Sequence, residues 1–497
     1  MKRWLILATL AFPAPLGAMA QTPGALPRSA PEAQGISSAD VLAFVDAADR
    51  QLDSMHGLVI VRHGKVIAEG WWAPYDASTP HPLYSLSKSF TSTAVGLAIA
   101  EGKLSLSDEI LKFFADDAPA EPSANLKAMR VSDLLRMSTG HQAEPSLKMD
   151  ATESWAKLFL AQPVPFKPGT HFQYNTPATY MLSAIVQKAT GQTTLDYLRP
   201  RLFEPLGIED PRWATSPQGV SLGGYGLTIK TEDIARFGQL YLNKGRWGGK
   251  QLIPESWVDA ATALQTSNGS NPKSDWDQGY GYQFWRCRNG AYRGDGAFGQ
   301  YCVVMPEQDT VVAINSSVRS MQEVLDLVWD RLLPALKSET LPPNESSATE
   351  LRNRLGRLSI RPAEGSATSP MAAKVVGKTY SSPPNDRKLE AIRIENGGDG
   401  STTIVARFDG GETRIPCGAG AWKKGRMAFG PGFPEQAAAA SAAWTGEDTL
   451  TSRIVFSEPP LTLTLRIQFE GEEARLLTET NTSNGPASCS VGWQGCC

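Results

Sequence analysis

The sequence predicts an α+β fold: an antiparallel sheet flanked by helices with a helical subdomain, followed by a small all-β domain. Strand-like segments occur early, within residues 57–72, and again late, within residues 280–315, whereas residues 85–244 favour helices. Strands at both ends of a helical middle indicate one sheet assembled from distant parts of the chain. Residues 461–469 alternate apolar and polar side chains without a break, which is typical of a half-buried strand.

The first twenty residues have the pattern of a secretory signal peptide. Lys2-Arg3 precedes an apolar run, Trp4–Leu16, and Ala18-Met19-Ala20 forms a small-residue cleavage site. We expect the mature chain to begin near Gln21 and to be periplasmic or secreted, the alternative being an ordinary buried N-terminal helix. Two prolines interrupt the run and no later segment approaches 18 apolar residues, so we expect no membrane span.

Residues 21–336 are predicted to form the first domain. It begins with an amphipathic helix over residues 41–52, and then Gly57–Arg62 and Lys65–Trp72 form a hairpin around a His63-Gly64 turn. The later predicted elements are strands at Tyr280–Cys287, Gln300–Met305 and Thr310–Asn315 and a helix at Ser320–Leu336.

The C-terminal third changes in character. Residues 337–374 are rich in Pro, Ser and charge, and they are predicted as a linker with a short helical piece near residues 350–358. Residues 375–484 are predicted as a separate β domain, and residues 485–497 as a Cys- and Gly-rich tail.

Composition excludes some classes of partner. The balance of 48 basic and 51 acidic side chains gives a net charge of -3, which offers no electrostatic footprint for nucleic acid. The six cysteines fit an oxidising compartment, and a bridge between Cys287 and Cys302 is plausible. Three cysteines in the tail lack zinc-finger spacing and a nearby histidine, so we expect no metal site and no cofactor. The oligomeric state stays open.

One segment carries an unusual charge. In LYSLSKSFTSTAVGLAIAEG, residues 83–102, the ammonium of Lys88 is the single charge before Glu101. If Ser85 begins a buried helix here, Lys88 lies one turn later on the same face. Desolvation lowers the pKa of such an ammonium, so the amine can serve as the base that a serine nucleophile needs. The segment predicts a nucleophile and its base.

Ser85 and Lys88 have other interpretations, and two other motifs in the sequence could suggest a different nucleophile. Ser85 could be a helix cap and Lys88 a surface lysine. A second S-x-x-K, at residues 270–273, lies in a polar loop and is a chance match. Residues 219–223 match G-x-S-x-G, but that elbow requires a histidine later in the chain, and all five histidines precede it.

Five segments occur in one order along the chain: Ser85-Leu-Ser-Lys88, VSDLLRMSTG at residues 131–140, FQYNTPATYML at residues 172–182, GGYGL at residues 223–227 and GRWGGKQLIPESW at residues 245–257. Together they resemble the penicillin-recognising serine hydrolases, which include class C β-lactamases, DD-peptidases, family VIII carboxylesterases and 6-aminohexanoate-dimer hydrolases. The resemblance covers residues 35–336 and implies the β-lactamase/DD-peptidase-like fold.

The resemblance implies a three-part site. Ser85 would be the nucleophile, Lys88 its base, and Tyr174 a proton relay to the leaving group through a phenolate or hydrogen bond tuned by Lys88. The third motif of the family, usually Lys-Thr-Gly or His-Thr-Gly, aligns with Gly294-Asp295-Gly296. The backbone N–H groups of Ser85 and Ala297 would form the oxyanion hole. Tyr174 could instead be a core tyrosine, and residues 294–299 a plain hairpin turn.

Two departures bear on the substrate. The tyrosine motif reads Tyr-Asn-Thr, so the contact with a substrate amide would come from Asn175 or be lost. The third motif has no Lys or His to meet a substrate carboxylate, and Asp295 adds a negative charge, which would favour neutral esters or amides whose far end is cationic. We expect an acyl-serine hydrolase of small ester or linear amide substrates; the alternatives are β-lactam or peptidoglycan stem-peptide hydrolysis and a non-catalytic cell-wall binding module.

Overall fold

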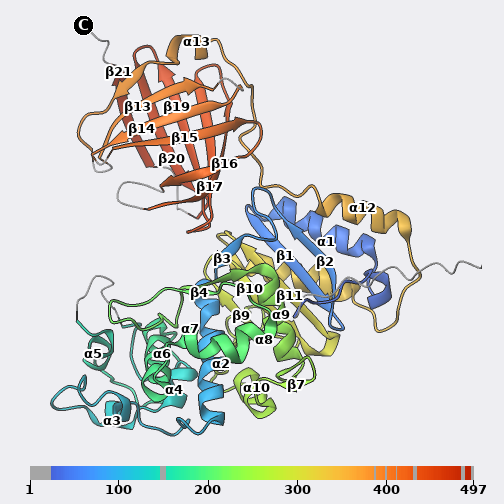
Figure 1. Cartoon of the computed structure of the whole chain (residues 1–497), viewed down its shortest axis with the longest axis vertical. Helices are drawn as coiled ribbons and strands as arrows, with labels where there is room; N and C mark the ends of the chain where they lie inside the picture. Colours follow the sequence, from blue (N-terminus) through green and yellow to red (C-terminus); the bar gives the residue numbers. More distant parts are fainter. Residues whose placement is uncertain are drawn as a thin grey trace, which may run out of the picture.

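The structure, a computed structural model, describes residues 24–145, 153–385, 388–397, 400–409, 411–428, 434–482 and 487–493. The predicted signal peptide, residues 1–20, lies outside the described residues. Figure 1 shows a β-rich C-terminal part above a larger part in which one sheet and its helices adjoin a helical subdomain. No helix in the described part of the chain is long and apolar enough to cross a membrane.

The central sheet has six antiparallel strands drawn from both ends of the first part. Its order is β2-β1-β11-β10-β9-β8, so the early hairpin lies against late strands, as predicted. The strands are β1 (Met55–Arg62), β2 (Lys65–Trp71), β8 (Trp285–Arg286), β9 (Tyr292–Gly296), β10 (Gln300–Met305) and β11 (Thr310–Ser316).

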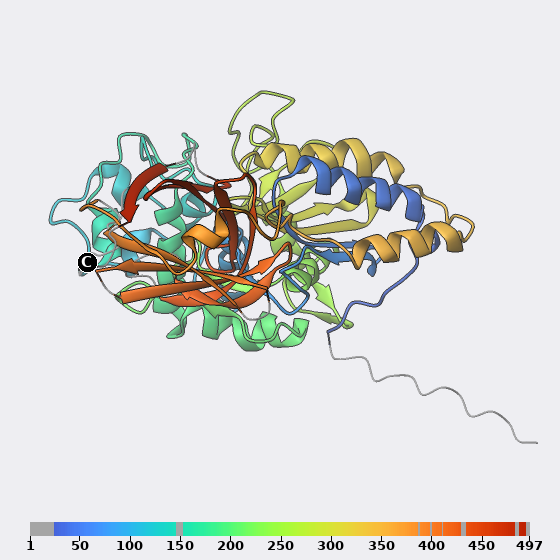
Figure 2. The ribbon, with the colours of Figure 1, turned by 90° about the horizontal axis from the view of Figure 1, so that it is seen from above.

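Helices cover both faces of this sheet. Along β1, Leu58 and Ile60 join the core beneath α1 (Ser38–Gln51) and α11 (Met321–Leu327), whereas Val59 and Val61 join the core of α2 (Ser87–Ala100) and α9 (Thr231–Leu242). Alternate residues of a strand point to opposite faces, which is why one strand feeds two cores. Figure 2 shows α1 beside the yellow and orange helices of the later chain.

The remaining elements of the first part are short. Its other α-helices are α3 (Ala124–Ala128), α4 (Val131–Leu135), α5 (Trp155–Leu160), α6 (Thr176–Thr190), α7 (Thr194–Leu198), α8 (Glu204–Leu206) and α10 (Glu255–Thr262). Tighter or wider helical turns occur at η1 (Glu32–Gln34), η2 (Tyr84–Leu86), η3 (Ile110–Phe113), η4 (Arg199–Phe203), η5 (Pro306–Gln308), η6 (Val328–Leu332) and η7 (Leu333–Ala335). Small strands are β3 (Pro80–Pro82), β4 (Arg212–Trp213), β5 (Leu227–Lys230), β6 (Arg246–Trp247) and β7 (Lys250–Gln251).

The C-terminal part is a nearly closed barrel. Its strand order is β15-β14-β13-β12-β21-β20-β19-β18-β17-β16, and a parallel pairing of β15 with β17 draws the edges together. The strands are β12 (Thr379–Ser381), β13 (Leu389–Asn396), β14 (Thr402–Phe408), β15 (Gly411–Ala419), β16 (Lys423–Ala428), β17 (Glu435–Trp444), β18 (Thr449–Phe456), β19 (Thr462–Glu470), β20 (Glu473–Thr480) and β21 (Ala487–Trp493). The strand β21 belongs to the segment predicted as a tail.

Several predicted elements differ in detail. Of the strand predicted at Tyr280–Cys287, only β8 forms, and the helix predicted at Ser320–Leu336 is α11 continued by η6 and η7. The predicted linker carries α12 (Glu345–Leu355), which lies against α1. Arg354 of α12 fixes this contact through ion pairs to Asp46 and Asp49, both at 2.7 Å.

The plausible bridge between Cys287 and Cys302 is contradicted. Both cysteines are free and buried. Cys302 lies in the core on the α2 side of the sheet and Cys287 in the core on the α1 side. The Cys287 sulfur accepts a hydrogen bond from Arg293 at 3.2 Å, and burial raises the pKa of both thiols. Opposite faces of a sheet cannot supply the geometry of a disulfide.

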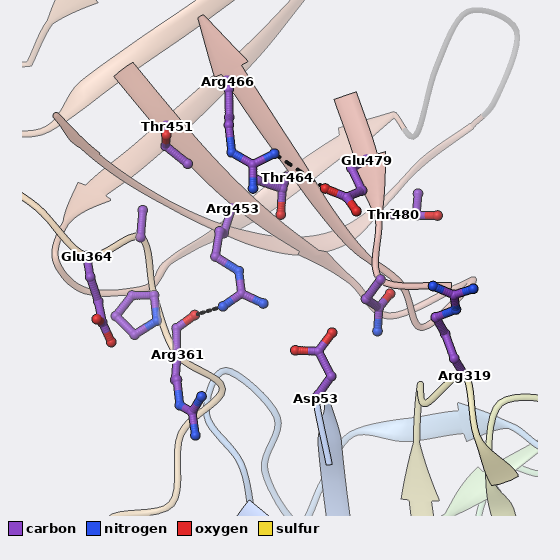
Figure 3. Close-up of a pocket in the computed structure, with 13 residues that line it drawn as sticks. Asp53, Arg319, Arg361, Glu364, Thr451, Arg453, Thr464, Arg466, Glu479 and Thr480 are labelled. Carbon is purple, nitrogen blue, oxygen red and sulfur yellow. Dashed lines mark hydrogen bonds and ion pairs between the residues drawn. The ribbon is translucent and has the colours of Figure 1, made fainter. Parts of the chain in front are cut away.

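The barrel meets the first part through polar contacts. Glu458 in the β18–β19 turn pairs with Arg212 at 2.6 Å, and the Tyr75 hydroxyl donates to the Phe456 carbonyl at 2.9 Å. A cavity of about 480 Å³ between the two parts is lined mainly by charged and polar side chains (Figure 3). In it, Arg453 points toward Asp53. Val455 of β18 joins the apolar core of the first part, so the interface combines polar and apolar contacts.

Candidate active site

Ser85 and Lys88 are held at the start of a buried helix. Ser85 lies in the helical turn η2, and α2 continues from Ser87, so the helix begins two residues later than the prediction placed it. Every α2 residue from Ser87 to Ala98 is buried. The helix is therefore enclosed on its whole circumference over more than two turns, which accounts for its lack of any charge other than Lys88.

The Lys88 ammonium has three oxygen partners. Its Nζ lies 3.0 Å from Ser85 Oγ, 2.7 Å from the Gly224 carbonyl and 3.3 Å from Thr176 Oγ1. A neutral amine has two N–H donors and one lone pair. Gly224 and Thr176 can accept the two donors, which leaves the lone pair aimed at the Ser85 hydroxyl. The geometry suits an amine that removes the serine proton.

Burial lowers the pKa of the Lys88 amine. Desolvation lowers the pKa of Lys88 from 10.5 to about 7, and the charges of Glu144 and Asp295 act in the opposite direction. Lysines become general bases when burial favours the neutral form near the working pH. The lowered pKa therefore favours a neutral Lys88 amine, with a free lone pair, far more than an ordinary lysine would allow at neutral pH.

Tyr174 completes the cluster as a neutral hydroxyl. Burial, and after it the charge of Asp295, raises the pKa of Tyr174 well above its ordinary value, although a hydrogen bond with Ser85 acts the other way. This contradicts a phenolate at neutral pH and leaves the hydrogen bond. The Tyr174 ring stacks on Trp285 at 5.5 Å, and Lys88 Nζ lies 4.9 Å from the ring centroid.

The third motif lies against the nucleophile because it is glycine-rich. A Cβ on Gly294 would come within 2.6 Å of Ser89 Oγ, and a Cβ on Gly296 would overlap the Leu83 carbonyl. The end of β9 can therefore approach η2 only without side chains at these positions. Ala297 follows directly in the turn to β10. The oxyanion hole formed by the backbone N–H groups of Ala297 and Ser85 remains a prediction.

The charge predicted at Asp295 is paired within the protein. Arg293 Nε lies 2.8 Å from Asp295 Oδ2, and both side chains are buried. The Arg293 guanidinium also lies 4.6 Å from the Trp276 ring and 5.4 Å from that of Trp285. Sequence reasoning missed this arginine, although residues two apart on a strand share a face. The argument that Asp295 offers a free negative charge is therefore wrong.

Asn175 has a structural position. It is the N-cap of α6: its side-chain oxygen accepts from the Ala178 N–H at 2.9 Å, and its amide nitrogen donates to Thr139 at 3.3 Å. The side chain is fully buried. Both ends of the amide bind protein atoms, which favours the alternative that the contact of Asn175 with a substrate amide is lost.

Comparison with known proteins decides the family. Residues 44–335, more than half of the chain, match the family model described as Beta-lactamase. The chain belongs to the β-lactamase family. Members of this family are in general serine hydrolases, and the buried Ser85–Lys88 pair lies within the matched residues.

Individual relatives of this β-lactamase-family chain are distant. It is 25% identical over 285 residues to the 6-aminohexanoate-dimer hydrolase of Paenarthrobacter ureafaciens, covering 52% of this chain and 71% of that one. It is 26% identical over 179 residues to the D-aminopeptidase of Brucella anthropi, but spans only 34% of that protein. The chain is also similar to the solved structure of EstCE1, a hydrolase with promiscuous acyltransferase activity, with a TM-score of 0.51 and 16% sequence identity. The match covers 59% of this chain and 99% of that one, and at this identity it supports the fold only.

One further residue at the site of this β-lactamase-family chain was missed from the sequence. Glu144 Oε1 accepts from the Thr176 backbone N–H at 2.6 Å, and its charge acts on both Lys88 and Tyr174. Glu144 is exposed, so it places a carboxylate at the edge of the catalytic cluster. No local pattern marks it, because it is 56 positions from Lys88 in the sequence.

The lowered pKa of Lys88 predicts a pH profile. We expect kcat/KM for an ester substrate to rise with pH and to reach half of its plateau near pH 7, because only the neutral amine accepts the Ser85 proton. An ordinary lysine, with a pKa of 10.5, would place this rise in strongly alkaline solution. Measuring kcat/KM between pH 5 and pH 9 checks the prediction; a flat profile from pH 6 to pH 8 contradicts it.

Glu144→Gln should shift that profile toward lower pH. The carboxylate stabilises the Lys88 ammonium and raises its pKa, so removing the charge favours the neutral amine at a lower pH. The glutamine can still accept from the Thr176 N–H. Because Glu144 is exposed, we expect a shift of less than about one pH unit, smaller in high salt. An unchanged or alkaline-shifted profile would show that Glu144 does not act on the base.

Proposed function

We propose that this chain is a serine hydrolase that cleaves short esters or linear amides through an acyl-enzyme on Ser85. The single observation that carries the proposal is the buried amine of Lys88, 3.0 Å from the Ser85 hydroxyl, with a pKa of about 7. A surface lysine beside a helix cap would have neither this burial nor this pKa.

The proposed reaction has two halves. Ser85 Oγ attacks the carbonyl carbon while its proton passes to Lys88 Nζ, and the developing oxyanion is bound by the N–H groups of Ser85 and Ala297. The proton then passes through the Tyr174 hydroxyl to the leaving alcohol or amine as the acyl–oxygen or acyl–nitrogen bond breaks. A water molecule then attacks the acyl carbon, and its proton passes through the same groups to Ser85 Oγ as the acyl–Oγ bond breaks and the acid leaves. The reaction needs no metal or organic cofactor.

The charges around the cluster support neutral or cationic substrates. The cation beside the third motif, Arg293, is fully buried and paired with Asp295, so it does not offer a contact to a substrate carboxylate. Glu144 instead places a negative charge at the edge of the site. A β-lactam or a peptidoglycan stem peptide carries a carboxylate, whereas a linear amide with a distant ammonium would be attracted by Glu144.

A small apolar pocket supports a short acyl group. A cavity of about 150 Å³ borders the site through Thr176, the residue that accepts from Lys88. It is lined by Pro145, Trp155, Thr176, Pro177, Tyr180, Leu222 and Tyr225. Relatives named 6-aminohexanoate-dimer hydrolase and D-aminopeptidase fit the same range of linear amides.

Export to the periplasm or beyond is part of the proposal and rests on the signal-like residues 1–20.

Active-site labelling and a substrate panel test the proposal. We expect a fluorophosphonate to form one adduct, on Ser85, because its hydroxyl lies 3.0 Å from the Lys88 amine and beside the predicted oxyanion hole, whereas the Thr176 hydroxyl, at 3.3 Å, serves as an acceptor for that amine. A p-nitrophenyl ester and the aminohexanoate dimer should be hydrolysed faster than a chromogenic cephalosporin. Ser270→Ala, in the second S-x-x-K, is the matched control and should label normally. An adduct elsewhere overturns the role of Ser85, and rapid Ser85-dependent cephalosporin hydrolysis overturns the substrate class.

A further inference from the structure

The barrel encloses an apolar cavity for which the proposed hydrolysis has no use. The cavity has a volume of about 560 Å³, within the range of roughly 300–1,000 Å³ of pockets that hold small molecules. Its lining comes from seven of the barrel strands, β13–β16 and β18–β20, and from Lys388 just before β13: Lys388, Leu389, Ile392, Ile404, Ala406, Phe408, Thr413, Ile415, Met427, Ala428, Ile454, Phe456, Leu463, Leu465, Leu476 and Thr478.

This space differs from ordinary core packing. Protein interiors are filled to crystal-like density and hold few voids larger than a water molecule, and small barrels either fill their interior with side chains or hold a ligand. An apolar cavity also gives water too few polar partners to remain there. A lining of aliphatic and aromatic side chains therefore favours an apolar occupant.

Strand β19 shows that the barrel separates two kinds of surface. Leu463 and Leu465 line the apolar cavity, whereas Thr464 and Arg466, on the opposite face, line the charged cavity between the two parts of the protein (Figure 3). The apolar cavity is thus the inside of the barrel and is distinct from the polar interface. Neither cavity includes Ser85, Lys88 or Tyr174.

The lining indicates the chemistry of the occupant. Its polar side chains are Thr413, Thr478 and Lys388, and among the described lining residues only Lys388 is charged. Lys388 is exposed and precedes β13, at the barrel end where the β18–β19 turn also lies. An ammonium at the rim of an apolar interior complements a molecule with an apolar body and an anionic head.

We propose that the C-terminal barrel binds one medium-chain aliphatic carboxylate, with the chain inside the cavity and the carboxylate beside Lys388. The apolar body gains by leaving water, while the head group remains solvated at the rim. The site is separate from the catalytic cluster, and it does not depend on the chemistry at Ser85.

Calorimetric titration of the full chain with dodecanoic acid tests this site. We expect saturable binding of one molecule per chain. Ala406→Trp places a large ring in the cavity and should weaken binding at least tenfold. Arg407→Trp, the neighbouring outward-facing residue of β14, is the matched control and should bind as wild type does. Absent binding, binding unchanged in Ala406→Trp, or equal loss in both variants would overturn the proposal.

A second variant tests the head group without threatening the fold. Lys388→Glu should weaken dodecanoic acid roughly threefold to tenfold at low salt and leave dodecan-1-ol unaffected, because only the acid carries a charge. Equal effects on both ligands would contradict the proposed orientation. Protein labelled at Ser85 with fluorophosphonate should bind dodecanoic acid as before; loss of binding after labelling would place the ligand in the catalytic cluster and overturn the barrel site.

Discussion

Lys88→Met should lower kcat/KM for ester hydrolysis by roughly 10³-fold or more, nearly as much as Ser85→Ala. The methionine keeps an unbranched apolar side chain in the helix but has no lone pair that can take the Ser85 proton. Because nucleophile and base act as one unit, the double variant should be no slower than the slower single variant. Steady-state kinetics on the three purified variants give the comparison.

Two further lysine variants separate the role of the base from that of charge or fold. Lys88→Arg keeps a cation, but a guanidinium cannot lose its proton at working pH, so we expect a loss as large as that of Lys88→Met. Lys103→Met, at an exposed position just after α2, should be fully active. If Lys88→Met kept more than about a tenth of the activity, another group would have to be the base.

The candidate pair of Ser85 and Lys88 could be singled out in the sequence because a helix that is buried on all sides contains few charged residues. A helix enclosed on all sides excludes charge, so one lysine three residues after a serine is conspicuous in residues 83–102. The partners that orient the amine could not be found in this way. The Gly224 carbonyl is a backbone atom without a side-chain signal, and Thr176 lies 88 positions away from Lys88.

The errors at the third motif have a physical cause as well. The motif residues 294–296 predict a free charge at Asp295 because its partner, Arg293, lies just outside them. Once β9 is recognised, Arg293 and Asp295 share one face and pair at 2.8 Å. The buried cap Asn175 could have been found, since asparagine before Thr-Pro is a typical start of a helix.

The sheets could be predicted from the sequence more completely than the ends of the individual segments. Strand-like segments at both ends of the first part and the alternating residues 461–469 predicted the two β-rich parts, and the structure confirms sheets in both. Segment ends depend on tertiary partners. Residues 487–493 form β21 because β20 and β12 offer paired edges, which composition alone cannot show.

Gly296→Ala should reduce kcat by about 10²-fold to 10³-fold with a much smaller change in KM. The new Cβ would overlap the Leu83 carbonyl and lie 3.1 Å from Tyr84 Cβ, so the end of β9 must move away from η2. That movement separates the N–H groups of Ala297 and Ser85, and loss of one oxyanion donor typically costs this much in rate. Overpacking at this contact should also lower the free energy of unfolding by about 1–3 kcal/mol.

A second strand glycine separates the steric effect from a general effect of alanine in a strand. A Cβ on Gly425 of β16 would meet only Pro416 Cγ at 4.0 Å, which is ordinary contact, and neither glycine has the left-handed backbone that alanine avoids. Gly425→Ala should therefore leave both activity and the urea midpoint unchanged. In Gly296→Ala, fluorophosphonate labelling of Ser85 should slow along with kcat, since the same donors stabilise charge on the phosphonyl oxygen. Unchanged labelling and turnover in Gly296→Ala would mean that Ala297 is not an oxyanion donor, whatever the stability of the variant.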